Sequence, residues 1–411
     1  MNVALRLYLH FFVFVFGLYT FFNRGVAYTY LAEASWLMGL FLATYYRRQL
    51  SIVWNNSMKV LLLLMIINLA YIVRGIQNYA ILDVVRDSFM FQYAGFIFII
   101  ALLRPLHDQL MQSIYKIYRW LPWVALSTLL LRTSIPEWNE FSLFGGIPLL
   151  IYKSSDLSVQ LLISCFFLLD GKLDLKPRWY ILQVIIMAYL FLLMATFSRG
   201  GLVAFFAGGA AFLFYIRNSD FAKPLFRYLR LAPVLLMIAI PLYMLTKIED
   251  DTQGRNTGIK QLTDNVTSIV DRNIQGGGLN DNILWRLAWW GKIVDYTILG
   301  EYFFQGKGLG VNLSVDDQMP ADESVRAPHN FHMNVLARYG VPFTLLWLYW
   351  LFLQFKTFRV ANMPREQLIY LCVMLAALVN ASFDVALEGP MAAMPFWVIT
   401  GLYYESQAKE E

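Results

Sequence analysis

Residues 178–216 read RWYILQVIIMAYLFLLMATFSRGGLVAFFAGGAAFLFYI. The two almost wholly apolar runs in this stretch, 178–196 and 200–216, are each long enough to cross most of the hydrocarbon core of a bilayer as a helix. The segment that joins them, Thr196-Phe-Ser-Arg-Gly-Gly201, holds one charge and two glycines. The pattern predicts two transmembrane helices connected by a tight turn.

The composition of the whole chain agrees with this stretch. Of 411 residues, 58% are apolar and 15% are charged, whereas soluble domains hold about 45–50% apolar and about 25% charged residues. This composition excludes the soluble globular, disordered and disulfide-rich classes. Cys165 and Cys372 both lie inside apolar runs, and their spacing predicts neither a disulfide nor a metal site.

Similar apolar runs recur along most of the chain, and we predict an all-α, polytopic transmembrane helix bundle of about 12 spans. The chain then divides into 1–247 with nine spans, a large outer loop at 248–332, and 333–411 with three spans and a tail. The expected spans are 8–22, 26–45, 59–73, 88–103, 119–132, 157–169, 178–196, 200–216, 231–247, 333–355, 366–382 and 391–404.

The net charge of +5 follows this topology and does not indicate a nucleic-acid partner. Cytoplasmic loops of membrane proteins carry an excess of Lys and Arg. With a cytoplasmic N-terminus, the inner loops and the two termini hold 18 of the 33 basic residues. We therefore expect both termini in the cytoplasm. The short outer loops hold only six basic residues, which are Arg24, Arg74, Arg86, Arg132, Lys153 and Arg199.

The large outer loop differs from the other connections in length and charge. It has 12 acidic and seven basic residues and contains two amphipathic segments. The first runs over 259–270, and the second, near 283–297, carries Trp285, Trp289 and Trp290. Because tryptophan favours the headgroup region, we expect the second segment to lie on the outer membrane surface with its indoles at that level.

Arg199 is the first candidate site residue, since it stands at the rim between the two helices quoted above. An arginine fork binds a phosphate or diphosphate, and Gly200 and Gly201 would let a ligand approach the backbone closely. Ser198 is a possible supporting residue. The alternative is an arginine that ends a helix and extends its head to water, with a glycine turn behind it.

Arg286, on the tryptophan-rich segment, is a second candidate phosphate ligand. Lys292 on the same segment is a possible supporting residue. The alternative is an arginine that stacks on an indole or binds ordinary anionic lipid.

Pro328-His-Asn-Phe-His332 precedes the tenth span. His329 can accept a proton near neutral pH, and Asn330 can orient a neighbour by hydrogen bonding. His329 and His332 share a helical spacing, but no Glu or Cys stands at a matching distance, so we predict no metal site. The alternative is a histidine with a structural role at an interface.

Two loop motifs carry weaker signals. Gly306-Lys-Gly-Leu-Gly310 lacks the frame of a phosphate-binding P-loop. The acidic stretch that begins with Asp316-Asp317 could hold a divalent cation but is more easily explained as a solvated turn.

Three further acids are considered. Asp384 and Glu388, in the last outer loop, either pair with one of the arginines or are ordinary loop charges. Glu33 lies inside a predicted span and is therefore a functional candidate.

In their order and sidedness these motifs resemble the O-antigen ligase and polymerase family of bacterial inner-membrane proteins. One departure is Arg338, where the family more often carries an acid, so we expect no acidic role for that helix. The motifs that carry the resemblance are Phe197-Ser-Arg-Gly-Gly201, Arg286 in its W-R-x-x-W-W helix, Gly306-x-Gly-x-Gly310, and Pro328-His-Asn330 ahead of a helix ending in Tyr-Gly340.

The resemblance implies a membrane-embedded glycosyltransferase of lipopolysaccharide biosynthesis. Its donor would be a glycan on undecaprenyl diphosphate at the outer leaflet, and its acceptor a sugar of the lipid A core. By position, Arg199 and Arg286 would hold the diphosphate, and His329 would take the proton from the acceptor hydroxyl, with inversion at the anomeric centre. No nucleotide, cofactor or metal is implied. The residues fit this chemistry by themselves, because a diphosphate is already an activated leaving group.

Three alternatives remain open. An O-antigen polymerase or a protein O-oligosaccharyltransferase would use the same donor, and the His-Asn motif and the single large loop favour the ligase. A transporter or lipid flippase would show broken helices and buried charges, whereas Glu33 is the main charge expected deep in a span. A structural scaffold would not gather arginine and histidine at one rim.

Overall fold

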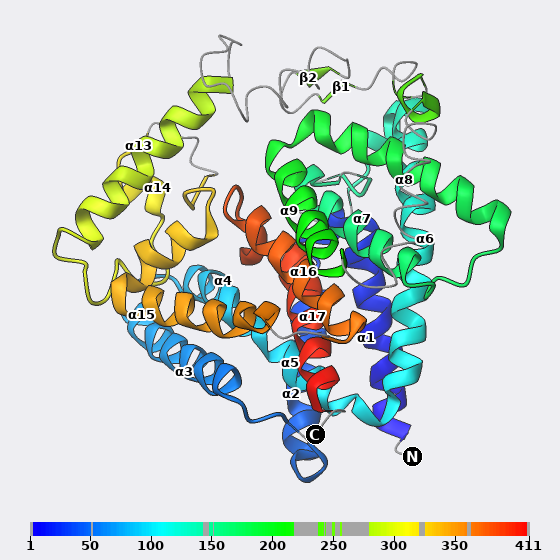
Figure 1. Ribbon diagram of the computed structural model, residues 1–411. Coiled ribbons are helices and arrows are strands. Elements are labelled where there is room, and N and C mark those ends of the chain that lie inside the picture. The colour runs from blue at the N-terminus through cyan, green and yellow to red at the C-terminus, as the bar shows by residue number, and fades with distance from the viewer. Residues whose placement is uncertain are drawn as a thin grey trace.

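Helices make up nearly all of the regular structure of the protein, as the apolar runs predict (Figure 1). The one exception among the described residues is a pairing of two short antiparallel strands, β1 (Glu249–Asp250) and β2 (Arg255–Asn256). The computed structural model describes residues 3–50, 52–142, 148–150, 152–217, 237–241, 243, 249–250, 255–256, 279–319, 325–359 and 363–408.

Fourteen α-helices are defined among these residues. They are α1 (Val3–Phe22), α2 (Leu31–Tyr45), α3 (Asn56–Ile76), α4 (Ile81–Gln92), α5 (Phe96–Leu102), α6 (His107–Ser134), α7 (Ser154–Leu169), α8 (Pro177–Phe197), α9 (Arg199–Ile216), α13 (Leu279–Thr297), α14 (Leu313–Asp316), α15 (Phe331–Phe355), α16 (Arg365–Ala381) and α17 (Pro390–Ala408). Short 3-10 helices join some of them: η1 (Asn23–Val26), η2 (Arg47–Gln49), η3 (Tyr93–Gly95), η4 (Arg104–Leu106), η5 (Pro136–Asn139), η6 (Lys356–Arg359) and η7 (Ala386–Glu388).

The chain is a multi-pass membrane protein. Five of the twelve predicted spans coincide with α2, α6, α7, α16 and α17, which are shorter or less apolar than the segments named at the end of this paragraph. The predicted span 231–247 lies mostly outside the described residues and the first amphipathic segment, 259–270, lies entirely outside them, so the count of twelve stays a prediction. Six described segments are long and apolar enough to cross a membrane: Val3–Val26, Asn56–Ile76, Ile81–Leu102, Pro177–Phe197, Arg199–Ile216 and Phe331–Phe358.

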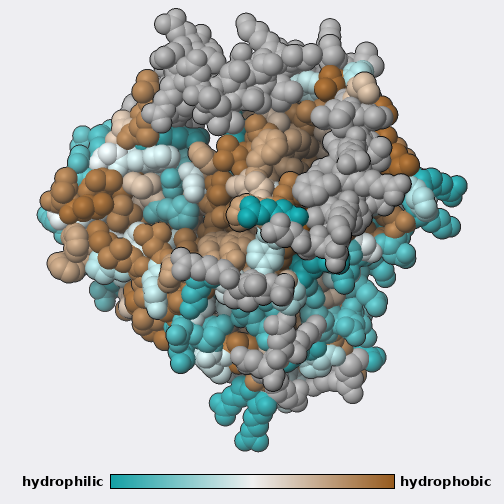
Figure 2. Space-filling model, in the orientation of Figure 1, coloured by the Kyte–Doolittle hydropathy of each residue, from teal (hydrophilic) through white to brown (hydrophobic). Residues whose placement is uncertain are grey.

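Both ends of the chain lie at the same end of the bundle (Figure 1). Figure 2 shows apolar side chains over much of the visible face and hydrophilic ones gathered toward the end where the termini lie. Because both termini lie at one end, the chain crosses the bundle an even number of times. The side of the membrane on which that end lies stays a prediction.

Helix α16 forms the centre of the bundle and packs against α7, α9 and α17. Glycine and alanine permit this close approach. A Cβ atom on Gly208 of α9 would lie only 2.9 Å from the carbonyl oxygen of Cys372 and 3.0 Å from the side chain of Ala376. Small residues bring membrane helices close enough for dispersion contacts to accumulate, since lipid offers no hydrophobic drive for helices to associate.

Helix α15 is broken near its middle. Gly340 has a left-handed φ of 78°, and Pro342 follows it. The break releases the carbonyl oxygens of Ala337 and Arg338, which accept hydrogen bonds from the N–H groups of Lys307 (2.8 Å) and Gly308 (2.9 Å). The glycine-rich motif 306–310 therefore closes the break, because an unsatisfied backbone group at such a site is costly. Its structural use agrees with the sequence prediction that it is not a P-loop.

Arg338 is buried, with 1% of its surface exposed, at the end of the first half of α15. Its guanidinium forms an ion pair of 2.7 Å with Asp87 of α4, and Asp87 also accepts a hydrogen bond of 2.9 Å from the N–H of Gly310. The prediction that Glu33 is the main charge buried within the helices is wrong, because it overlooked this ion pair. Glu33 instead accepts a hydrogen bond from Tyr93.

Helix α13 matches the predicted second segment of the large loop but not its predicted setting. Trp289 is fully buried in a small second core with Ile293 and Leu313, and its indole N–H donates 2.6 Å to Asp317. The indole of Trp290 donates 2.9 Å to the carbonyl of Pro328. Trp289 therefore faces protein, because an amphipathic helix can bury its aromatic face against protein as well as lipid. The position of this helix at headgroup level stays a prediction.

In the acidic stretch, Asp317 is buried and serves as an anchor, so the expectation of a solvated turn is wrong for this residue, whereas Asp316 is exposed and Asp322 and Glu323 lie outside the described residues. Lys307 forms ion pairs with Asp316, at 2.6 Å, and with Asp317. Lys292 donates 3.0 Å to the backbone carbonyl of Asp317. These contacts fasten α13 and the glycine-rich motif to each other.

We expect Asp87→Ala to destabilise the protein strongly, since it leaves the buried guanidinium of Arg338 unpaired. The loss of one partner of a buried ion pair costs about 3–5 kcal/mol. Thermal unfolding in detergent measures the effect. Asp83→Ala is the matched control, because Asp83 lies on the same helix in an exposed pair with Arg86 and should cost less than about 1 kcal/mol. Equal losses in the two variants would contradict the role given to Arg338.

Candidate functional site

A cavity of about 450 Å³ opens among α6, α7, α8, α13 and the segments before α15 and after α16. Among the described residues, Arg24, Arg132, Lys153 and Arg286 bring positive charge to it, and Asp384 is its one acid. Part of its wall is apolar and includes Leu129, Leu157, Leu193 and Met194. Ser198 and His329 also line it.

Asp384 joins the groups on one wall of this cavity. Its carboxylate lies 3.0 Å from the Lys153 ammonium and accepts a hydrogen bond of 3.1 Å from Ser155. Nδ1 of His329 lies 3.7 Å from the same carboxylate, which is too long for a hydrogen bond but close enough for charge to act. Asp384 thus pairs with a lysine and a histidine. One of the two sequence interpretations proposed a pair with an arginine, which the described ion pairs do not include.

The charges of this pair are stable near neutral pH. Burial would raise the pKa of Asp384, but the Lys153 charge and the contact with His329 outweigh it and hold that pKa well below its usual range. Burial would lower the pKa of Lys153, but the charges of Asp384 and Asp156 raise it above the usual value. Both groups therefore keep their charges from about pH 4 to pH 10.

Arg286 reaches this cavity from α13. Its guanidinium donates 3.0 Å to the carbonyl oxygen of Phe383, the residue before Asp384, and lies 5.7 Å from the ring of Trp285. Trp285 also meets the His329 imidazole edge to face, with ring centroids 5.7 Å apart. The large loop thus brings Arg286 and His329 to the same space, although 43 positions separate them in the sequence.

The comparison with known families bears on this same part of the chain. Residues 184–348 match the family model described as O-antigen ligase. The resemblance to the O-antigen ligase family is confirmed. The matched segment begins in α8 and ends in α15, so it contains Arg199, Arg286 and His329. Members of this family are membrane enzymes that act on lipid-linked glycans. A search of curated proteins finds no match.

Within the matched segment, local backbone geometry presents His329 to the cavity. His329 has a left-handed φ of 49°, an uncommon conformation for a residue with a Cβ. Asn330 is the N-cap of α15, and its side-chain oxygen accepts from the N–H groups of His332 and Met333 at 2.9 and 3.1 Å. Capping thus explains why Asn330 follows the histidine, since it sets where the helix begins.

The other family motif, 197–201, also caps a helix. Ser198 is the N-cap of α9, and its hydroxyl accepts 3.0 Å from the N–H of Gly201. Arg199 is the first residue of that helix; its neighbour Ser198 lines the cavity, whereas Arg199 itself is not among the lining residues. The space beside the glycines is filled by protein: a Cβ on Gly200 would lie 2.8 Å from that of Phe383. Gly200 therefore lets α9 approach Phe383, the residue before Asp384, and Gly201 lets it approach α7, a use the sequence interpretation did not foresee.

Three predicted supporting residues point elsewhere. His332 accepts a hydrogen bond of 3.2 Å from Trp347 within the helices, and Lys292 is held by Asp317. Glu388 accepts 2.7 Å from Asn334 of α15. Among the residues described, no group of three His, Cys, Asp or Glu side chains is arranged to hold a metal ion.

Lys153, Arg24 and Arg132 are site residues that the motifs did not reveal. All three were counted among the six basic residues of the short outer loops. Their positive charge is the signal that could have identified them, because outer loops of membrane proteins usually carry few basic residues.

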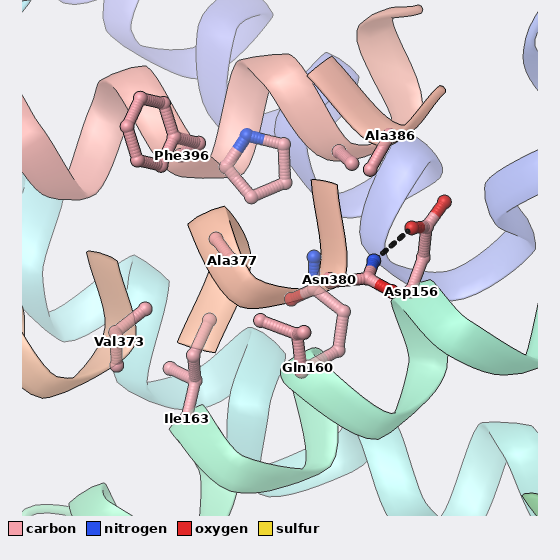
Figure 3. A pocket seen from close by; sticks show the side chains of 11 residues that line it. Asp156, Gln160, Ile163, Val373, Ala377, Asn380, Ala386 and Phe396 are labelled. Atoms are coloured by element: carbon pink, nitrogen blue, oxygen red, sulfur yellow. Dashed lines mark hydrogen bonds between the residues drawn. The ribbon is translucent and has the colours of Figure 1, made fainter. Parts of the chain in front are cut away.

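A hydrogen bond between side chains of α7 and α16 supports one side of the cavity that contains His329. Asn380 donates 2.9 Å to Asp156 beside a small cavity of about 20 Å³ (Figure 3). Asp156 lies one helical turn beyond Lys153, and Asn380 one turn before Asp384. The bond therefore holds the two helices in the register that brings Lys153 and Asp384 together.

We expect the stability difference between the wild type and Asp384→Asn to stay flat from about pH 5 to 9. It should shrink below about pH 4, since a carboxylate with a lowered folded-state pKa loses its contribution as it is protonated. Thermal unfolding as a function of pH measures it.

Glu388→Gln is the contrasting variant for that series. Burial raises the pKa of Glu388 to about 7, despite the Arg338 charge and the hydrogen bond from Asn334. The wild type should therefore lose stability relative to Glu388→Gln as the pH rises from about 4 to 7. Flat differences for both variants would show that these charge states are wrongly assigned.

We expect Gly200→Ala to destabilise the protein by about 1–3 kcal/mol, because the added methyl meets Phe383. Gly209→Ala is the matched control on the same helix, since its Cβ would meet open space and an alanine favours the helix by up to about 1 kcal/mol. Unfolding midpoints decide between the two outcomes. An unchanged Gly200→Ala midpoint would refute the close approach.

Proposed function

We propose that the protein is an O-antigen ligase. It would transfer a glycan from undecaprenyl diphosphate to a sugar hydroxyl of the lipid A core, at the periplasmic face of the bacterial inner membrane. The observation that carries this proposal is one cavity in which His329 and Arg286 face the same space, within a segment similar to O-antigen ligases.

The cavity suits the donor in both charge and polarity. The guanidinium and ammonium groups around its mouth can neutralise a diphosphate, and a water-poor setting strengthens each such contact. The apolar part of the wall, which includes Leu129, Leu157 and Leu193, suits the first part of a polyprenyl chain. The one acid does not repel the donor strongly, because Lys153 compensates the charge of Asp384.

The proposed reaction needs one proton acceptor and one anion stabiliser. The acceptor hydroxyl oxygen forms a bond to the anomeric carbon while the bond from that carbon to the diphosphate oxygen breaks. His329 takes the hydroxyl proton, and the diphosphate leaves with the electron pair. The carboxylate of Asp384 lies 3.7 Å from Nδ1 of the His329 imidazole. Direct displacement at the anomeric carbon inverts its configuration.

Arg286 and Arg199 would stabilise the charge that develops on the diphosphate. The carbonyl of Phe383 and the ring of Trp285 hold the guanidinium of Arg286 before a ligand binds, so little ordering remains to be done. Arg199 begins α9, whose N-terminal backbone dipole also favours an anion.

Polymerases and protein O-oligosaccharyltransferases would place the same donor in the same cavity, and only the acceptor distinguishes them. The transporter alternative gains a broken helix and a buried ion pair from the structure. These features explain each other, however, since Arg338 pairs with Asp87 and the glycine-rich motif satisfies the freed carbonyls. Neither the broken helix nor the buried ion pair therefore requires a transported ion or solute to explain it.

The decisive experiment reconstitutes the purified protein with a lipid-linked glycan and three acceptors: lipid A core, a second lipid-linked glycan and an acceptor peptide. Transfer to lipid A core is expected. Chain growth on the carrier lipid would replace the ligase by a polymerase, and glycosylated peptide would replace it by a protein O-oligosaccharyltransferase. Movement of the glycan across the membrane without bond formation would support the transporter.

We expect His329→Ala to reduce transfer by about 10²–10⁴-fold, the usual contribution of a general base, while the affinity for the donor stays within a few-fold. Initial rates and donor binding measure the two effects. His10→Ala, at an exposed histidine on α1, should retain wild-type rates. A His329→Ala enzyme with full activity would exclude the proposed base.

A further inference from the structure

A second cavity, of about 280 Å³, lies between the end of α3, the connection from α3 to α4 and the segment 302–316. It shares no lining residue with the cavity that contains His329. The residues that line it are Tyr71, Arg74, Asn78, Tyr79, Tyr302, Lys307 and Asp316, together with backbone at Gly75, Gly308, Leu309 and Val311.

The lining of this cavity combines aromatic faces with hydrogen-bonding groups. Tyr79 is 43% exposed, and Tyr302 is half-buried beside it in the lining. Asn78 is exposed, and its amide donates 3.0 Å to the carbonyl of Arg74, which leaves its side-chain oxygen toward solvent. No ion pair of the described residues involves Arg74, whereas the Lys307 ammonium already has Asp316 as a partner.

The walls of the cavity are held in place before any ligand binds. A Cβ on Gly310 would lie 2.6 Å from that of Tyr79, and one on Gly75 would lie 3.0 Å from the carbonyl oxygen of Leu309. Backbone this close on both sides fixes the ring of Tyr79 against the glycine-rich motif. Rigid aromatic platforms bind ligands at a low entropic cost.

The two cavities flank the same half-helix. His329 precedes α15, and the glycine-rich motif bonds to the carbonyl of Arg338 at the break. His329 and Arg338 are nine positions apart, which corresponds to roughly 13 Å at the rise per residue of an α-helix. That is a distance that a few linked sugar units span. Arg74 and Lys153, one on each cavity, both belong to the outer loops expected from the charge pattern.

We propose that this second cavity binds a sugar unit of a substrate glycan, a few units away from the bond that forms beside His329. The apolar face of a sugar ring packs on a tyrosine, and its hydroxyls exchange hydrogen bonds with Asn78, Arg74 and the exposed carboxylate of Asp316. Such a mixture of aromatic surface and a few fixed polar groups is typical of ligand sites. The inference rests on the proposed function. The glycan belongs either to the donor or to the acceptor, and the same chemistry serves both.

Titration calorimetry on the full-length protein in detergent tests this proposal with two probes. One is the oligosaccharide released by mild acid from lipid A core, and the other is the oligosaccharide released from the lipid-linked donor. We expect Tyr79→Ala and Asn78→Ala each to weaken the binding of one probe at least tenfold. The probe affected identifies the substrate whose glycan occupies the cavity.

Controls separate this site from the reaction centre. Tyr45→Ala, at an exposed tyrosine on α2, and Arg178→Gln, at an exposed arginine on α8, should bind both probes as the wild type does. Wild-type protein that binds neither probe, or Tyr79→Ala and Asn78→Ala proteins that bind both normally, would overturn the proposal.

The proposed function fails on a different result, namely full transfer by His329→Ala. If transfer survives that change while Tyr79→Ala loses glycan affinity, the second cavity stands and the assigned reaction centre falls. If His329→Ala abolishes transfer while the binding of both probes is unaffected by Tyr79→Ala, the reaction centre stands and the second cavity falls.

Discussion

The ion pair between Arg338 and Asp87 is the constraint on which both cavities depend. A guanidinium with 1% of its surface exposed costs several kcal/mol to bury unless a carboxylate and further acceptors surround it. Asp87 meets that need from α4, and the carbonyl of Val311 adds an acceptor at 3.2 Å. Burial of one charge therefore brings α4, α15 and the glycine-rich motif to a single point.

A chain of hydrogen bonds leads from the same arginine toward the cavity that contains His329. The Nε–H of Arg338 donates 2.9 Å to Asn334, whose amide donates 2.7 Å to Glu388. Glu388 lies four positions after Asp384 in the segment between α16 and α17. A continuous chain of polar contacts thus runs along the first half of α15, between the two cavities. Its rigidity suits a site in which a displacement of about 1 Å can reduce a rate a hundredfold.

The cavity that contains His329 is mostly cationic, and a lysine compensates the charge of the carboxylate that it also contains. An isolated Asp384 would repel a diphosphate, but Lys153 at 3.0 Å compensates its charge, while the carboxylate stays 3.7 Å from Nδ1 of His329. Arg286 contributes positive charge from α13, a helix that Trp289 and Asp317 anchor to protein. Anchoring explains why a helix outside the bundle can hold a ligand group in a fixed place.

The sequence by itself determined the helical, membrane-spanning class and the resemblance to O-antigen ligases, and it proposed Arg286 and His329 as candidates, because apolar run length, loop charge and short motifs are local properties. It did not determine which residues meet. Lys153, Asp384 and Arg338 carry no motif, and their roles come from partners more than 45 positions away. Tertiary structure also decided that Trp289 points into protein and that Gly200 serves helix packing. Amphipathicity shows that a face must be buried, but only the packed neighbour determines whether protein or lipid covers it.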